Sequence, residues 1–291
     1  MSGRTAARSS RSRSLLAAVV VLAVLTLAVP GTAGRFSATI ANSSDTTSAA
    51  TRFTCANTFA NHKADAYFTY ELTATGSTAI DSSGQGNPGT FHPGAPGPVK
   101  PADSTTACSR DTDAQYYYAP DGTSDWISTA TSVGTSPANF TLAIWFRTSA
   151  AGGYLIGLNG AQTADAATYD RHVYIDTSGR LVFGTYSATY QTVTSSSAYN
   201  DGGWHQVVAT MSSTAGMALW VDGSKVGSNA SYTSAQANTG WWSIARGNLN
   251  GWPGAPSPAY FAGGLRFVAA YRVVLSDAEI AAEYNNGQPG V

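Results

Sequence analysis

Short runs in which every second residue is apolar recur along this chain, and small or turn-forming residues separate them. The clearest example has one run at 204–211 and a second at 217–221. Because side chains alternate between the two faces of a strand, each run predicts a strand with one buried face. Small residues at 212–216 join the two runs, and Asp222-Gly223 is typical of a tight turn into a third strand. The alternation therefore predicts antiparallel hairpins.

Runs of this kind follow one another at the spacing expected of an all-β sandwich or barrel. A helix is expected only near the end, where Ser276 and Glu279 have the spacing of a capping box before Ile280 and Tyr284. The pattern predicts strands at 115–118, 140–148, 154–158, 172–176, 180–186, 204–211, 217–221, 241–246 and 265–271.

The first 33 residues have the pattern of a secretory signal. Four arginines open the chain: Arg4, Arg8, Arg11 and Arg13. An apolar run at 15–29 follows, and small residues at 31–33 provide a cleavage point. The run is shorter than the roughly 20 residues of a spanning helix, although an uncleaved anchor is the alternative reading. We expect an exported protein whose N-terminal arm, 34–65, is extended.

Charge argues against a nucleic-acid partner. Removal of 1–33 leaves 12 basic and 17 acidic residues, with no basic cluster. Proteins that track phosphates derive most of their affinity from clustered Lys and Arg. No membrane contact is expected beyond the N-terminal anchor of the alternative reading.

Two cysteines, Cys55 and Cys108, are present. An even count in an exported chain favours a disulfide, and two separate thiols are the alternative. The bridge would close a loop of about 53 residues and contribute about 4 kcal/mol in the chain-entropy model.

The stretch "DGGWHQVVATM…MALWVDGSKVG" resembles the central hairpin of the laminin G-like jelly-roll family, within the concanavalin A-like lectin/glucanase superfamily. Further landmarks occur in family order: "YFTYELTATGSTAIDSSGQGNPGTF" at 67–91, "DAQYYYAPDGTSDWIST" at 113–129, "NFTLAIWFRTS" at 139–149 and "GGLRFVAAYRVVLSDAEIAAEYN" at 263–285.

The resemblance implies an antiparallel two-sheet jelly-roll sandwich at 66–286, with a short C-terminal helix and a tail at 287–291. It also implies that the working residues lie on exposed rim loops. One departure is Arg266-Phe267 in the closing strand, where the family often carries an acidic pair. A cation role of those acids is therefore not transferred to this chain.

Catalysis is not expected. Retaining glycoside hydrolysis needs two carboxyl groups about 5 Å apart, and the only glutamates are Glu71, Glu279 and Glu283. No strand presents a closely spaced glutamate array. His205 shares a strand face with apolar Val207, which favours a structural histidine. A glycosidase or lyase with an unusual carboxylate arrangement is the remaining enzymatic alternative.

Recognition of a ligand suits the chain better. Four tryptophans, Trp220, Trp241, Trp242 and Trp252, fall within 33 residues, and asparagines and a tyrosine accompany them. An aromatic face packs on a pyranose ring while amide, carboxylate and guanidinium groups bond its hydroxyls. Candidate ligand-binding residues are Trp242, Asn248, Asn250, Trp252 and Tyr260, together with Tyr169, Asp170 and Arg171.

Each candidate has a structural alternative. Alternation must send one residue of the pair Trp241-Trp242 into the core, and Asp170-Arg171 is as well explained by a local ion pair. Loop aspartates and asparagines would suit calcium, but their spacing is not diagnostic, so no cofactor is expected. The sequence thus favours a secreted or surface-attached, non-catalytic glycan-binding module. An adhesive matrix protein with a protein partner is the alternative.

Overall fold

The computed structural model describes residues 55, 62–73, 76–93, 99–101, 107–108, 116–163 and 166–285. The predicted signal at 1–33, nearly all of the arm at 34–65 and the tail at 287–291 lie outside the described residues. Among the described residues, no helix has the length and apolarity that a membrane crossing requires.

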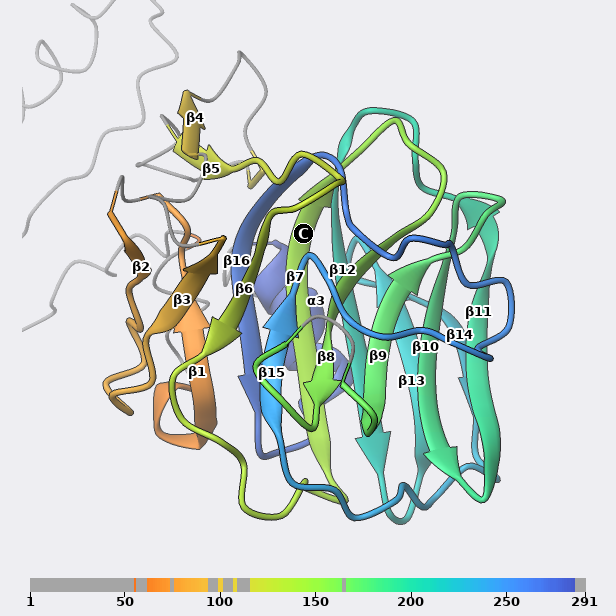
Figure 1. Cartoon of the computed structure of the whole chain (residues 1–291). Coiled ribbons are helices and arrows are strands. Elements are labelled where there is room, and N and C mark those ends of the chain that lie inside the picture. Colours follow the sequence, from red (N-terminus) through yellow and green to blue (C-terminus); the bar gives the residue numbers. More distant parts are fainter. Residues whose placement is uncertain are drawn as a thin grey trace, which may run out of the picture. The chain divides into compact units, whose positions relative to one another are not determined.

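Two antiparallel sheets face each other in a sandwich (Figure 1). In chain order the strands are β1 Ala66–Tyr70, β2 Thr78–Ala79, β3 Gly89–His92, β4 Val99–Pro101, β5 Tyr116–Tyr118, β6 Trp126–Thr129, β7 Phe140–Arg147, β8 Gly153–Asn159, β9 Tyr169–Ile175, β10 Arg180–Ser187, β11 Thr189–Ala198, β12 Trp204–Ser212, β13 Gly216–Val221, β14 Ser224–Asn229, β15 Trp241–Ile244 and β16 Gly264–Tyr271. Within the described residues, a 3-10 turn, η1, covers Lys63–Asp65, and a helix, α3, covers Asp277–Tyr284.

The strand order explains the jelly-roll form. One sheet has the order β14-β13-β12-β7-β16-β5-β4, with β1 also paired to β16. The other has the order β11-β10-β9-β8-β15-β6-β3-β2. Strands distant in sequence are neighbours in both sheets, so the connections cross between the layers. The predicted all-β, two-sheet class with one C-terminal helix is confirmed.

Alternation along the strands divides the interior. On β7, Phe140 and Phe146 point into the main core between the sheets. Trp145 points the other way, into a second cluster beneath α3. Both faces of β7 are therefore covered, which explains why nearly all of its residues are buried.

Helix α3 closes the outer face of the first sheet. Ser276 forms the predicted capping box with Glu279, so the backbone N–H groups of both residues are satisfied. Ile280 is buried, and the ring of Tyr284 stacks on Trp145 with centroids 5.7 Å apart. The disulfide Cys55–Cys108 lies in the same cluster, with its Cα atoms 6.3 Å apart. The predicted bridge is thus confirmed.

The predicted hairpin at 204–221 is formed by β12 and β13. Asp222 (φ 51°) and Gly223 (φ 73°) make the turn into β14, because both adopt the left-handed conformation that this turn needs. His205 contacts two carboxylates, Asp222 at 2.8 Å and Asp201 at 3.1 Å. Its expected structural role agrees with these contacts.

Two differences from the expected strands have local causes. The predicted strand at 241–246 ends at Ile244, because Ala245 has φ 66° and so departs from the extended conformation, although its N–H still donates to the Leu155 carbonyl of β8. Strand β11 was not expected, since it is rich in Ser and Thr and buries few side chains. It is an edge strand, so pairing with β10 is sufficient to hold it in place.

Candidate functional site

The chain between β15 and β16 crosses the outer face of β8, β9 and β10 (Figure 1). Gly184 on β10 leaves the space that Trp252 fills, since a Cβ there would lie 2.2 Å from the indole ring. The indole meets His172 edge-on, with centroids 4.8 Å apart. The Tyr174 hydroxyl donates to the Pro253 carbonyl at 2.6 Å. The crossing loop is therefore packed onto the sheet.

Beneath the loop, burial and the neighbouring Arg171 charge lower the pKa of His172 to about 3. Burial raises the pKa of Tyr154, whose hydroxyl lies 3.2 Å from the His172 Nδ1. His172 is thus neutral near pH 7. Together with Trp252, these residues form the floor on which the loop rests.

The two polar–aromatic patches expected from the sequence meet at this loop. The Tyr169 hydroxyl donates to the Asn250 carbonyl at 2.9 Å. The Asn248 side chain donates to the Ala166 carbonyl at 3.0 Å and accepts from the Asn250 N–H at 2.9 Å. Side chains more than seventy positions apart in sequence therefore share one surface.

A tyrosine that the sequence reading missed completes this surface. Tyr190 is 44% exposed, and its ring lies 5.0 Å from the buried Trp252 and 5.5 Å from Tyr186. Tyr186 and Tyr190 face each other across the β10–β11 turn. Two tyrosines that flank the short segment Ser187-Ala188-Thr189 were the available signal, but without a predicted β11 they could not be paired.

The loop also encloses a hollow of about 420 Å³. Its wall includes the guanidinium of Arg246, which lies 4.3 Å from the centre of the Tyr260 ring. We refer to this hollow and its aromatic margin as the loop surface. Its defining residues are Tyr169, Tyr190, Arg246, Asn248, Asn250 and Tyr260.

Four predicted ligand-binding residues are buried and so have little surface to offer a ligand, although Trp252 helps to line the loop hollow. Trp242 is 0% exposed in the main core, because alternation along β15 turns its partner Trp241 outward. Trp252 is 4% exposed and anchors the loop. Asp170 and Arg171 form a buried ion pair.

The Asp170–Arg171 pair fastens loops to the sheet. Arg171 donates to the carbonyls of Pro137 and Gln236, and Asp170 accepts from the Tyr186 N–H at 2.7 Å. Burial, opposed by Arg171, raises the pKa of Asp170 to about 6. Both side chains form hydrogen bonds within the protein, and these bonds hold the segments beneath the loop surface in place.

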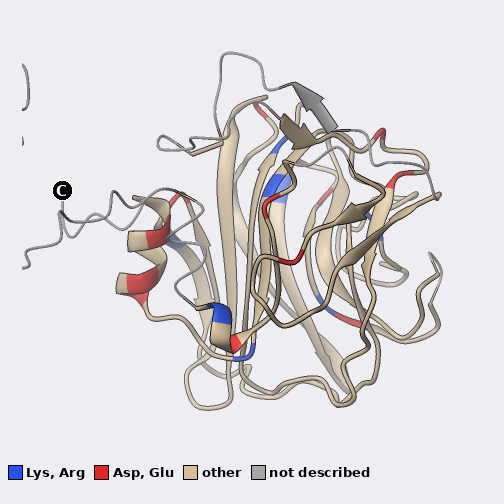
Figure 2. Cartoon of the chain, turned by 90° about the vertical axis from the view of Figure 1, so that its left-hand side faces the viewer, with Lys and Arg blue, Asp and Glu red and all other residues tan. Residues whose placement is uncertain are grey.

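Charged residues elsewhere are few and scattered, and acidic residues lie on α3 (Figure 2). Within the described ranges, no group of three or more His, Cys, Asp or Glu side chains is arranged to hold a metal ion. Arg266, at the departure from the family pattern, is buried and donates to the Tyr116 carbonyl at 3.0 Å.

A two-sheet sandwich with a loop-built surface belongs to the class of jelly-roll domains. The family model of the concanavalin A-like lectin/glucanases superfamily, laminin G type, matches residues 121–281, more than half of the chain. The chain belongs to this superfamily. A search of curated proteins finds no match.

Solved structures show the same fold at low identity. Domain 4 of AbnA, a GH43 extracellular arabinanase from Geobacillus stearothermophilus solved with arabinotriose, has a TM-score of 0.54 at 12% identity, covering 75% of this chain and 98% of that one. The binding domain of botulinum neurotoxin DC, solved with rat synaptotagmin II, has a TM-score of 0.52 at 14% identity, covering 78% and 53%. The chain thus spans about half the length of the toxin domain. At these identities the likeness shows the fold alone.

Proposed function

We propose that this protein is a non-catalytic binding module that recognises carbohydrate outside the cell through its loop surface. The observation that carries the proposal is the exposed ring of Tyr190, which lies against Trp252 of the crossing loop, together with the hollow of about 420 Å³ that Asn248, Asn250 and Trp252 help to line. An exposed aromatic face can pack on a sugar ring, and amides bond its hydroxyls. The arabinotriose bound by the arabinanase domain lends support by analogy of fold.

The chain organisation belongs to the same proposal. Residues 1–33 would be the export signal, 34–65 an arm, 66–286 the jelly-roll domain and 287–291 a tail. The Cys55–Cys108 bridge suits an oxidising compartment outside the cytoplasm.

The proposal of a non-catalytic role rests on where the glutamates lie. Glu283 is buried under α3, and Glu279 caps that helix. Neither lines the loop surface. A hydrolase of the retaining or inverting kind needs two carboxyl groups across a bound sugar, and the residues that line the loop hollow carry none.

A glycan array followed by calorimetry with each positive glycan tests the function. Tyr190→Ala should weaken binding by about tenfold or more, because truncation of a stacking aromatic removes a central contact. Tyr116→Ala is the matched control, since Tyr116 is 37% exposed on β5 and does not line the loop hollow. Trp252→Ala is unsuitable, because it would release the loop itself.

An array on which no glycan binds would contradict the proposal. If Tyr190→Ala binds glycan with the same affinity as the wild type, the binding site lies outside the loop surface. Self-association, or binding to a defined surface protein, would then favour the adhesive alternative. Release of reducing sugar from a polysaccharide would favour the enzymatic one.

A further inference from the structure

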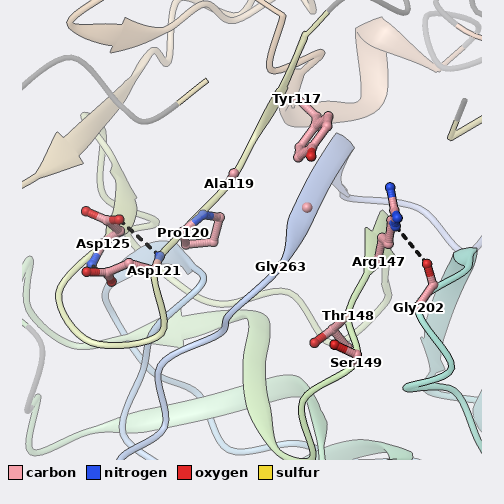
Figure 3. A pocket seen from close by; sticks show the side chains of 11 residues that line it. Tyr117, Ala119, Pro120, Asp121, Asp125, Arg147, Thr148, Ser149, Gly202 and Gly263 are labelled. Atoms are coloured by element: carbon pink, nitrogen blue, oxygen red, sulfur yellow. Dashed lines mark hydrogen bonds between the residues drawn. The ribbon is translucent and has the colours of Figure 1, made fainter. Parts of the chain in front are cut away.

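A second hollow, of about 380 Å³, lies where four connections meet at one end of the sandwich (Figure 3). We refer to it as the rim hollow. It shares no lining residue with the hollow under the crossing loop. Its lining is Tyr117, Ala119, Pro120, Asp121, Asp125, Arg147, Thr148, Ser149, Gly202, Gly263 and Gly264.

Glycines open the rim hollow and position its aromatic wall. A Cβ on Gly263 would lie 2.1 Å from the Arg147 carbonyl, so only glycine allows β16 to start here. A Cβ on Gly264 would lie 3.0 Å from the Tyr117 ring. That ring is held edge-on by Trp204, with centroids 5.5 Å apart. The Tyr117 ring is therefore half-buried, and Trp204 and Gly264 hold it in place.

A carboxylate forms one side of the hollow. The Asp121 N–H donates to the Asp125 Oδ2 at 3.0 Å, and within the described ranges no donor is bonded to its Oδ1. Burial raises the pKa of Asp125. The Asp121 carboxylate, by contrast, accepts N–H bonds from Thr123 and Ser124 and so is engaged in the turn. Asp125 thus keeps an acceptor for a ligand.

A positively charged side chain lies on the opposite side. The Arg147 Nε donates to the Gly202 carbonyl at 2.7 Å, which orients the guanidinium group at the wall. Figure 3 shows Arg147 on one side of the hollow, the two aspartates on the other, and Tyr117 between them. Ser149 adds an exposed hydroxyl group.

These groups combine an aromatic face with a carboxylate acceptor and a side chain of opposite charge. A ligand of either charge would meet one like-charged wall, whereas a neutral ligand with hydroxyl groups would meet none and could donate to the carboxylate. The volume is near the lower end of the range for small-molecule sites, which favours one or two sugar rings over a long chain. We infer that the rim hollow is a second binding site, which takes a single neutral sugar residue such as the end of a glycan. The ligand class rests on the proposed function, but the site is separate from the loop surface.

Titration of the full-length protein with glucose, galactose, mannose, xylose and arabinose, each alone, tests this inference by calorimetry. At least one sugar should bind saturably. Ser149→Phe should weaken that binding at least about tenfold by filling the hollow. Ala151→Phe is the matched control, because Ala151 is exposed on the same connection but does not line the hollow.

Asp125→Asn provides a second variant. It keeps the acceptor for the Asp121 N–H and replaces the other oxygen by a donor, so it should also weaken binding about tenfold. Tyr190→Ala should leave monosaccharide binding unchanged, whether or not it weakens polysaccharide binding. The inference is overturned if no sugar saturates the wild type. It is also overturned if both rim variants keep wild-type affinity, or if Tyr190→Ala abolishes monosaccharide binding.

Discussion

His205 is held between two carboxylates at the end of β12, with Asp222 at 2.8 Å and Asp201 at 3.1 Å. The hydrogen bond to Asp222 is the main cause that raises the pKa of His205 above its usual value of 6.5. The folded state therefore holds this proton more tightly than the unfolded chain. The resulting stability is complete below pH 6.5 and is lost as the pH rises through the folded pKa.

His205→Gln should accordingly lower the melting temperature more at pH 5.5 than at pH 8.5. The cost at acid pH should be about 1 kcal/mol or less, because Asp201 is largely exposed and solvent screens that pair. Thermal unfolding followed by circular dichroism at the two pH values measures the difference. A deficit that is the same at both values would show that the imidazole contributes by packing alone.

At the scale of an element, α3 carries a carboxyl group that it does not expose. Glu283 is buried against Tyr271, whose hydroxyl donates to it at 3.5 Å. Burial raises the pKa of Glu283 to about 8. The folded protein keeps this proton, while the unfolded chain loses it above pH 4.5. The buried Glu283 carboxyl group therefore destabilises the folded state increasingly between pH 4.5 and 8.

Glu283→Gln removes that titration and should stabilise the protein as the pH rises. At pH 8 the gain should be several kcal/mol, since each pKa unit corresponds to about 1.4 kcal/mol. Urea unfolding at pH 5 and pH 8 measures it. Asp277→Asn is the control, because this carboxylate is exposed on the same helix. A Glu283→Gln gain that does not grow with pH would mean that the carboxyl group is solvated.

At the scale of the whole molecule, one covalent bond joins the region before β1 to the connection between β4 and β5. Cys55 and Cys108 are 53 positions apart and lie in the cluster under α3. Replacing both by Ser should lower the free energy of unfolding by about 4 kcal/mol, the loop-closure entropy of a crosslink of this length. Denaturant unfolding measures the loss. A reductant should weaken the wild type and leave the double variant unchanged, and two free thiols in unreduced wild type would contradict the bridge.

Local signals were strong enough to predict much of the fold. Alternation predicted the β12–β13 hairpin, and the Asp222-Gly223 step predicted its turn. The Ser276 and Glu279 spacing predicted the helix cap. Each of these depends on residues within one hairpin or one helical turn. Strand β11 lacked such a signal, because an edge strand with few buried side chains has no apolar alternation.

The candidate site could not be located from the sequence, because contacts between distant segments form it. The asparagines and aromatic residues near 241–260 have side chains suited to ligand binding, and the sequence shows this. The sequence does not show which of these side chains are buried. Trp252 became an anchor because Gly184, on another strand, leaves room for its ring. Tyr190 gained its place beside Gly251 and Trp252 because β11 pairs with β10 and the crossing loop lies next to that edge.

By itself, then, the amino-acid sequence determined the class of fold, the hairpin turns, the helix cap and the family, since these follow from local periodicity and backbone preference. The tertiary structure alone decided which aromatic rings are exposed, that Asp170 and Arg171 bind each other, and where the two hollows open. The physical reason is that exposure depends on which segments pack together. Segments distant along the chain meet only when the two sheets assemble.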